Sequence, residues 1–328
     1  MEVKINIAVT GTGSLIGQAI IKSMKKSCLT NEIRIVGCDY FSNTVGSFWC
    51  DQNYILPDIL KEENRVQWRH DIFKIITEES ISILFVGVDF ELMLFAGLKD
   101  EIEESTGCVV IVSNKRVLEI GNDKYLTYEF LKSIDLNYPE TWLPDEMDQA
   151  EIEFPCILKP RVGARSKGVY VVKSKGDLLN KLPLVDGPVI QKLIGNNNSE
   201  YTCSVLCVDN KMVDSIVLHR YLKEGNTHLA EYRKYFKQNI YDYIKEIAIK
   251  LQPYGSCNLQ LRLDNDQEPY LFEINPRFSG TTYMRSLLGF NEVEFMIKYV
   301  SGYHIEPFHL KEGKILRYYE EVLLENKS

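Results

Sequence analysis

A short segment near residue 275 combines a predicted strand with three polar side chains that could do chemistry. Glu273 and Asn275 are two residues apart, so on a strand both side chains leave the same face. A carboxylate and an amide oxygen side by side suit Mg²⁺, which prefers oxygen ligands. Arg277 follows and offers a planar guanidinium to a phosphate or a carboxylate. The segment predicts a nucleotide and metal site or, as the simpler alternative, a strand end with a solvated Glu and a surface Arg.

A second predicted strand, residues 258–263, precedes this segment, and the turn Asp264-Asn265-Asp266 joins the two. This hairpin would bring Gln260 beside Glu273 and Asn275 as a third oxygen donor. We therefore predict these three residues as ligands of one hard divalent cation site.

A basic, glycine-containing loop lies between two predicted strands, residues 154–160 and 169–172. Four cations fall within nine residues there: Lys159, Arg161, Arg165 and Lys167. Since the whole chain has a net charge of −8, this concentration favours a flap that closes over phosphates, rather than a solvated hairpin tip. The loop is not a Walker loop, because no helix follows it and the G-x-x-x-x-G-K-[ST] order is absent.

Residues 122–132 are predicted as a helix with Asn122 as its N-cap and Lys124 in its first turn. A cation in the first turn opposes the helix dipole, so an anion beside Lys124 would explain its place. A surface lysine without a ligand is the alternative.

The chain opens with a predicted βαβ unit: strand 5–9, the glycine turn Thr10–Gly17, helix 15–24 and strand 33–37. Asp39 follows the second strand, where a dinucleotide-binding fold places the acid that contacts the ribose. The glycine spacing is G-x-G-x-x-x-G and not G-x-G-x-x-G. It favours the alternative of a tight turn that lets strand and helix pack closely.

Further strands are predicted at residues 81–88 and 109–112, with a helix at 72–79. Strands that alternate with helices predict a parallel sheet covered on both faces. Asp89 and Glu91 follow the carboxyl end of strand 81–88, where open parallel sheets bind ligands. They could hold the amine of a substrate, and Glu91 could equally cap the helix that follows.

The second half of the chain predicts strands at 188–194, 201–208 and 212–219, a loop-like segment at 222–230 with Gly225 and Asn226 as turn residues, and helices at 240–251 and 293–300. Four polar residues between the hairpin and the first of these helices are candidates to contact a substrate: His219, Arg220, His228 and Arg233. A surface or packing role is the alternative for each of them.

The composition sets further limits. With 328 residues, 45% hydrophobic and 26% charged, the chain can form two or three structural units. The acidic balance argues against a general nucleic-acid binder. No apolar run approaches the roughly 18 residues of a membrane span, and the first residues carry no signal-peptide pattern. The eight cysteines form no CxxC pair, so we expect a reduced, cytoplasmic protein without a membrane partner.

Taken in order, these motifs resemble the ATP-grasp superfamily, most closely the branch similar to the large subunit of carbamoyl-phosphate synthase. The matching segments are 122–124, 154–160 with the glycine loop, 189–194, Glu200, 258–260 and 272–277. The resemblance covers about residues 110 to 300. It implies an α/β chain: a Rossmann-like domain that precedes the ATP-grasp module (1–118), a small ATP-grasp subdomain with the phosphate flap (119–186), and a C-terminal ATP-grasp subdomain with the metal site (187–328).

The resemblance also implies roles for individual residues. Lys124 and Lys159 would hold ATP phosphates, and Arg277 would steady an acyl phosphate or the substrate carboxylate, which makes Lys159 and Arg277 the expected catalytic residues. The residues implied for the flap are Gly163, Ser166 and Gly168; for adenine and ribose Gln191, Lys192, Leu193, Ile194 and Glu200; and for one or two Mg²⁺ or Mn²⁺ ions Gln260, Glu273 and Asn275. Two departures from the family pattern are Gln191, where an acid is more usual, and Ala164-Arg165 in the flap.

The implied activity is an ATP- and magnesium-dependent ligase that activates a small carboxylate as an acyl phosphate, releases ADP and joins the carboxylate to an amine. Substrate contacts are expected from Asp89, Glu91, Arg220 and His228. Carbamoyl phosphate synthesis itself is not expected, because the chain holds one ATP-grasp unit and no amidotransferase segment. The alternatives are a nucleotide-binding regulator and an NAD-dependent oxidoreductase that uses Gly11–Gly17 and Asp39. A homodimer is expected from frequency alone.

Overall fold

The computed structural model describes residues 4–163 and 167–323. The chain divides into two compact units, one made of Met1–Val112 with Phe278–Ser328 and the other of Ser113–Arg277. Among the described residues there are six short 3₁₀ segments: η1 (Val45–Trp49), η2 (Glu62–Asn64), η3 (Asp89–Glu91), η4 (Pro144–Glu146), η5 (Leu182–Leu184) and η6 (Asn197–Ser199).

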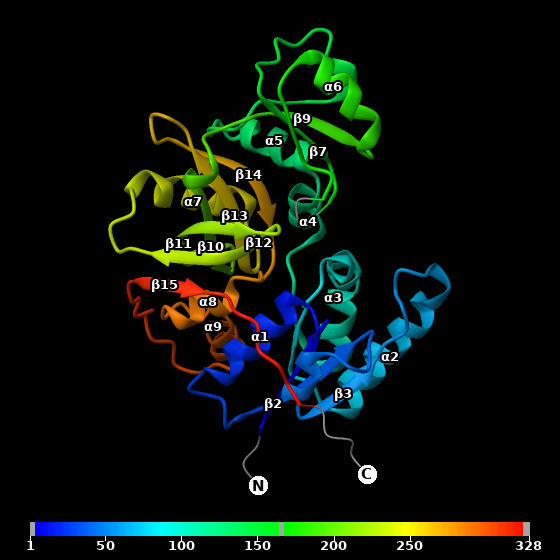
Figure 1. The fold of residues 1–328 in the computed structure, drawn as a ribbon. Helices are drawn as coiled ribbons and strands as arrows, with labels where there is room; N and C mark the ends of the chain where they lie inside the picture. Colours follow the sequence, from blue (N-terminus) through cyan, green and yellow to red (C-terminus); the bar gives the residue numbers. More distant parts are fainter. Residues whose placement is uncertain (1–3, 164–166, 324–328) are drawn as a thin grey trace. The chain divides into compact units, whose positions relative to one another are not determined.

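The first unit is built on a parallel sheet in the order β3-β2-β1-β4-β5 (Figure 1). Its strands are β1 (Ile5–Thr10), β2 (Ile33–Asp39), β3 (Gln52–Ile55), β4 (Ile83–Phe85) and β5 (Val109–Ile111), and its first helices are α1 (Leu15–Lys25), α2 (Arg65–Glu78) and α3 (Leu92–Thr106). The central strands are β-branched and buried, as expected for a sheet covered on both faces. The predicted βαβ unit is therefore confirmed.

The glycine turn after β1 serves close packing. A side chain on Gly17 would place its Cβ 2.2 Å from the carbonyl oxygen of Gly11, so only glycine allows this approach of α1. Ser14 caps α1 by accepting hydrogen bonds from the backbone N–H groups of Ile16 and Gly17.

The C-terminal segment Phe278–Ser328 belongs to the first unit. They form α8 (Thr282–Leu287), α9 (Glu292–Val300) and β15 (Gly313–Leu316). The hydroxyls of Ser23 and Ser286 lie 2.8 Å apart, and the rings of Phe85 and Phe278 meet edge to face at 5.4 Å. The boundaries expected from sequence placed these residues with 187–277, and they foresaw neither α8 nor β15. Contacts between the two ends of a chain leave no local sequence signal.

The second unit begins with α4 (Lys115–Asn122) and α5 (Lys124–Ser133) and continues into an antiparallel sheet of order β6-β9-β7-β8. Its strands are β6 (Thr141–Trp142), β7 (Cys156–Pro160), β8 (Tyr170–Val172) and β9 (Pro188–Lys192), with helix α6 (Lys175–Lys181). The N-cap of α5 is Asp123, and not Asn122 as predicted, because the Asp123 carboxylate accepts hydrogen bonds from the N–H groups of Tyr125 and Leu126.

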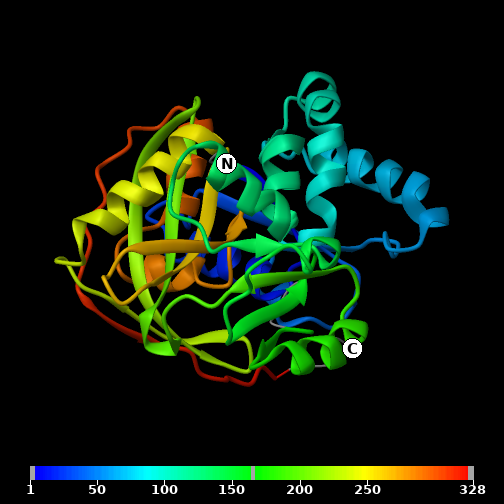
Figure 2. The same cartoon turned by 90° about the horizontal axis from the view of Figure 1, so that it is seen from above.

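A second antiparallel sheet completes this unit in the order β14-β13-β10-β11-β12, and α7 (Gln238–Leu251) packs against it (Figures 1 and 2). The strands are β10 (Glu200–Val208), β11 (Lys211–Lys223), β12 (Asn226–Tyr232), β13 (Gly255–Leu263) and β14 (Pro269–Asn275). The prediction of a loop-like segment at 222–230 is wrong. Glu224 and Gly225, with φ of 52° and 74°, form a tight turn between two strands, and Asn226 already lies in β12.

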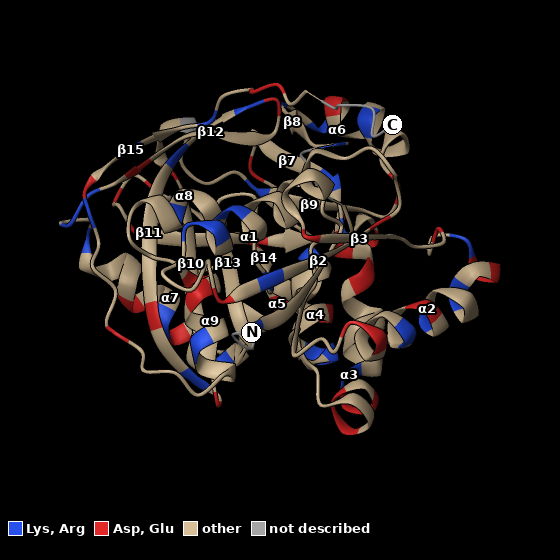
Figure 3. Cartoon of the chain, turned by 90° about the horizontal axis from the view of Figure 1, so that it is seen from below, with Lys and Arg blue, Asp and Glu red and all other residues tan. Residues whose placement is uncertain are grey.

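Figure 3 shows acidic and basic residues interspersed along α2 and acidic residues at the end of α3. Within residues 4–163 and 167–323, no helix is both long and apolar enough to cross a bilayer.

Candidate functional site

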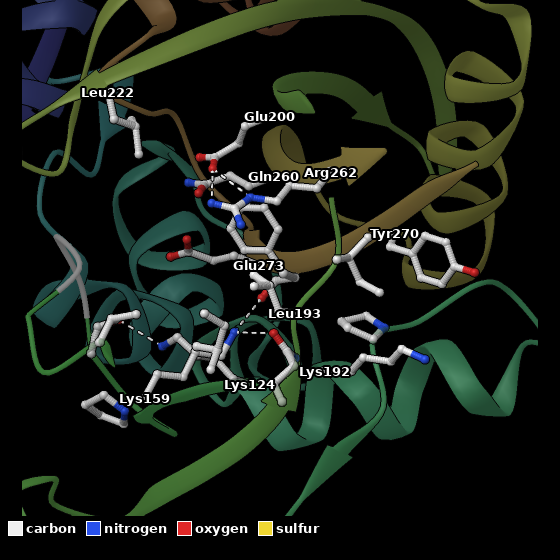
Figure 4. A pocket seen from close by; sticks show the side chains of 18 of the residues that line it. Lys124, Lys159, Lys192, Leu193, Glu200, Leu222, Gln260, Arg262, Tyr270 and Glu273 are labelled. Atoms are coloured by element: carbon white, nitrogen blue, oxygen red, sulfur yellow. Dashed lines mark hydrogen bonds and ion pairs between the residues drawn. The ribbon is translucent and has the colours of Figure 1, made fainter. Parts of the chain in front are cut away.

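A cavity of about 160 Å³ in the second unit is lined by residues from both of its sheets (Figure 4). Most of the residues predicted to bind ATP lie in it: Lys124, Lys159, Gly163, Gln191, Lys192, Leu193, Ile194, Glu200, Gln260 and Glu273. Arg220, expected as a substrate contact, also lines it. Segments up to 149 residues apart in the sequence therefore converge on one pocket.

Lys159 lies at the centre of one end of this pocket. It is 5% exposed, and its Nζ donates hydrogen bonds to the Oε1 of Gln191 at 2.7 Å and to the carbonyl oxygen of Phe272 at 3.4 Å. Burial, helped by the charge of Lys124, lowers the pKa of Lys159 to about 7, and Glu273 opposes this shift. A bound anion would favour the charged amine, so the residue is suited to a phosphate.

Gln191 orients this lysine. Its side chain accepts from Lys159 and donates from Nε2 to the hydroxyl of Thr141 at 2.8 Å. The amide found where the family more often has an acid therefore belongs to a buried chain of hydrogen bonds that fixes the ammonium group.

Lys124, the first residue of α5, closes the same end. Its Nζ donates to the carbonyl oxygens of Arg161 at 3.3 Å and Gly163 at 3.1 Å, which ties the base of the flap to the helix. Burial lowers the pKa of Lys124, and the nearby carboxylates of Glu273 and Asp123 oppose this. Two partly desolvated lysines that line the same pocket indicate an anion site.

The flap is described only at its ends. Gly163 and Lys167 line the pocket, and Gly168 adopts a φ of 72°. Ser166, predicted to contact phosphate, lies outside the described residues, as do Ala164 and Arg165.

The hinge residues after β9 give the pocket part of its apolar wall. Leu193 and Ile194 line it, whereas the Nζ of Lys192 pairs with Glu153 at 2.9 Å. The backbone N–H of Lys192 donates to the carbonyl oxygen of Glu140 at 2.8 Å.

Glu200 is held by two arginines at the other end of the pocket (Figure 4). Arg220 donates from Nε and Nη2 to its Oε1, and Arg262 donates from Nε and Nη2 to its Oε2. Burial alone would raise the pKa of Glu200, but the two guanidinium groups hold it below its usual value. Sequence reasoning missed Arg262, although its two-residue spacing from Gln260 on one strand face was a usable signal.

Glu273 and Gln260 are direct partners in the pairing of β13 with β14, as the predicted hairpin required. Figure 4 shows the Glu273 carboxylate directed into the pocket. Gln260 accepts a hydrogen bond from Arg220 at 2.6 Å, and the Oδ1 of Asn275 accepts one from Arg277 at 2.9 Å. Asn275 and Arg277 are not among the residues that line the cavity in the described part of the chain.

This donor set fits a magnesium ion that is shared with a polyphosphate. Within the described residues, no group of three or more His, Cys, Asp or Glu side chains could hold a metal alone. Mg²⁺, however, is usually held by one or two carboxylates together with substrate phosphates and water. Glu273, with the amide oxygens of Gln260 and Asn275 nearby, can supply that incomplete shell.

Three expected substrate contacts lie elsewhere. His228 is on β12 and Asp89 is an exposed residue of η3, and neither lines the pocket among the described residues. Glu91 is fully buried, accepts hydrogen bonds from the hydroxyls of Thr10 and Tyr40, and has its pKa raised to about 7 by burial. A carboxyl group closed off in this way is not accessible to a substrate amine.

The glycine turn of the first unit is also closed. The Asp39 carboxylate accepts hydrogen bonds from the N–H of Gly13 at 2.7 Å, the hydroxyl of Thr12 at 3.0 Å and the N–H of Tyr40 at 2.7 Å. These bonds occupy the acid that a dinucleotide fold would use for ribose, so the tight-turn interpretation is favoured.

Comparison with known proteins places this geometry in context. Residues 121–281 match the family model described as an ATP-grasp domain. Over 270 residues the chain is 23% identical to a carbamoyl-phosphate synthase of Methanobrevibacter smithii, which covers 77% of this chain and 70% of that protein.

Two solved structures share the fold. An ADP complex of N5-carboxyaminoimidazole ribonucleotide synthetase has a TM-score of 0.74 at 13% identity and covers 94% of this chain and 80% of its own. An L-amino acid ligase from Bacillus licheniformis has a TM-score of 0.70 at 16% identity, and the match covers 92% of this chain and 75% of the ligase chain. These likenesses confirm the α/β fold expected from the sequence.

Proposed function

We propose that this chain, whose residues 121–281 form an ATP-grasp domain, is an ADP-forming carboxylate–amine ligase that depends on ATP and magnesium. The observation that carries the proposal is the convergence of Lys124, Lys159 and the Glu273 carboxylate on one pocket. Two structural neighbours are themselves named as a synthetase and an amino acid ligase, which supports the same class of reaction.

The γ-phosphoryl group of ATP would pass to a substrate carboxylate, giving ADP and an acyl phosphate. A substrate amine would then attack the acyl carbon and release inorganic phosphate. Glu273 would hold the metal with Gln260 and Asn275, and the bound metal would neutralise charge across the β- and γ-phosphates.

The chain itself would mainly position charge, since in-line phosphoryl transfer needs little covalent help from a protein. Lys159, oriented by Gln191, would be protonated and donate hydrogen bonds to the phosphates. Lys124 would add a second positive charge and also hold the base of the flap. Arg277, held by Asn275, would steady the acyl phosphate. The flap would exclude water, because water would hydrolyse the acyl phosphate in an open site.

Two other functions fit less well. A regulator without chemistry would not need Lys159, Glu273, Asn275 and Arg277, all of which are present. An NAD-dependent oxidoreductase would need the Asp39 carboxylate that Gly13 and Thr12 already occupy. The proposal also includes a small carboxylate and a small amine as partners, a homodimer and a cytoplasmic location.

The proposal is tested by measuring ADP and phosphate release from magnesium-ATP across a panel of amino acids and small carboxylates. We expect one pair of substrates to stimulate release, with product detected by mass spectrometry. Titration with NADH, followed by nicotinamide fluorescence, separates the alternatives. Saturable NADH binding without ATP affinity would reverse the assignment, and ATP binding without stimulated release by any carboxylate and amine would favour the regulator.

A further inference from the structure

The Glu200 end of the pocket differs from an ordinary hydroxyl-binding acid. Both oxygens of the carboxylate are engaged, each by the Nε and Nη2 groups of one arginine, at distances between 2.6 and 3.0 Å. The Glu200 side chain is 5% exposed, and those of Arg220 and Arg262 are 9% and 20% exposed. The three charges form one largely desolvated cluster.

This cluster leaves Glu200 without acceptor capacity. An ionised carboxylate has about four lone-pair sites, and four N–H groups already point at them. The neighbouring side-chain acceptor, the Oε1 of Gln260, takes a hydrogen bond from Arg220 at 2.6 Å. The two carboxylate oxygens of Glu200 are thus directed to guanidinium groups, and not to a ribose hydroxyl.

The sheet fixes the arrangement from two sides. Glu200 on β10 and Arg262 on β13 are direct partners in the strand pairing, and Arg220 comes from β11 on the other side of β10. Arg262 also lies 5.8 Å from the centre of the Phe272 ring. If either arginine moved away from Glu200, part of a buried charge would lose its partner. The free energy lost would exceed that gained from one hydrogen bond to a ribose hydroxyl.

We propose that this pocket binds adenine nucleotides without selecting for the ribose hydroxyls, and that Glu200 is a positioning residue for the two arginines. The inference rests on the proposed function, since it takes a nucleotide as the ligand. A ribose hydroxyl could still accept a hydrogen bond from an arginine N–H that does not point at Glu200. When the ligand lacks that hydroxyl, a water molecule can take its place at little cost in affinity. An acid free to accept from a hydroxyl would instead discriminate by about tenfold or more.

The test is calorimetric titration of the full chain with magnesium-ADP, magnesium-2′-deoxyADP and magnesium-3′-deoxyADP. We expect the three dissociation constants to agree within about threefold. A deoxynucleotide that binds more weakly than that would overturn the inference while leaving the proposed function intact. Failure of all three to bind would instead refute the proposed function, so the two failures are distinguishable.

A variant adds an independent readout. Arg262→Met frees the Oε2 of Glu200 while Arg220 still neutralises the carboxylate, so the preference for ADP over the deoxynucleotides should rise to about tenfold. Because each ratio is taken within one protein, a general loss of affinity cancels. Arg65→Met, which removes a 56%-exposed arginine paired with Glu62, is the control and should keep the wild-type ratio. A folded Arg262→Met protein with an unchanged ratio would overturn the role given to Glu200.

Discussion

Replacement of Lys159 by Met tests the electrostatics of the site without a ligand. Met keeps the unbranched shape but removes the buried amine, whose pKa falls from 10.5 to about 7. The folded state therefore releases a proton near pH 7, whereas the unfolded chain keeps it until about pH 10.5. Between these values the unfolded state binds more protons, so the stability of the wild-type protein should rise with pH.

The size of this effect follows from the interval between the two pKa values. At 1.36 kcal/mol per pH unit, Lys159 contributes a rise of at most about 5 kcal/mol between pH 7 and 10.5, and about 3 kcal/mol between pH 7 and 9.5. Loss of the bond to Gln191 costs a further ~1–3 kcal/mol in the variant, but this term does not depend on pH. The pH dependence, and not the absolute stability, is therefore the diagnostic quantity.

Urea unfolding of both proteins between pH 7 and 9.5 measures the effect, because other titrating groups cancel in the difference between wild type and variant. We expect the free energy of unfolding of the wild-type protein to increase relative to that of Lys159→Met as the pH rises. Lys192→Met, at a lysine whose side chain is 41% exposed, is the control and should follow the wild-type slope. Parallel curves for wild type and Lys159→Met would show that the amine stays charged and would refute the reasoning.

Three further changes probe other parts of the chain. Glu273→Ala should abolish magnesium-dependent ATP turnover while circular dichroism stays native, and turnover at the wild-type rate would exclude this carboxylate as a metal ligand. Burial raises the pKa of Glu91 to about 7, so between pH 4.5 and 7 the carboxyl ionises only in the unfolded chain, and the wild-type protein should lose at most about 3 kcal/mol of stability as the pH rises. Glu91→Gln should not show this loss. Arg285→Met should cost about 3–5 kcal/mol in urea unfolding, since it leaves the fully buried Glu292 without the charge that it pairs with; a loss below 1 kcal/mol would contradict a buried ion pair.

Much of this site could be predicted from local patterns. The predicted neighbourhood of Gln260 and Glu273 is confirmed by the strand pairing. The pairing that begins beside the turn, at Leu263 and Pro269, shifts by one residue between Gln260 and Leu261, and this irregularity sets Gln260 opposite Glu273. The cluster of cations around the flap predicted a phosphate pocket, and Lys159 lies in the cavity found there. Spacing of two on a strand is enough to predict which side chains share a face.

The rest depends on contacts between distant segments. Glu91 and Glu200 are both acids at predicted strand boundaries, yet one is sealed under Thr10 and Tyr40 and the other is clamped by two arginines. No local pattern separates them, because burial and pairing are set by strands that meet only in the folded unit. The packing of Phe278 against Phe85 escaped prediction for the same reason.

The two acids of the pocket show how pairing divides their roles. Glu200 is neutralised by two guanidinium groups, so it adds rigidity and leaves one net positive charge at its end of the pocket. Glu273, by contrast, opposes the lowered pKa values of both Lys124 and Lys159 from across the cavity. A polyphosphate would favour the charged amine of Lys159, whose pKa burial lowers to about 7, so this end of the pocket gains positive charge when the ligand enters. Glu273 is then the one pocket carboxylate among the described residues with capacity left for a cation, which is why its loss should stop turnover while the loss of Arg262 should alter nucleotide selectivity.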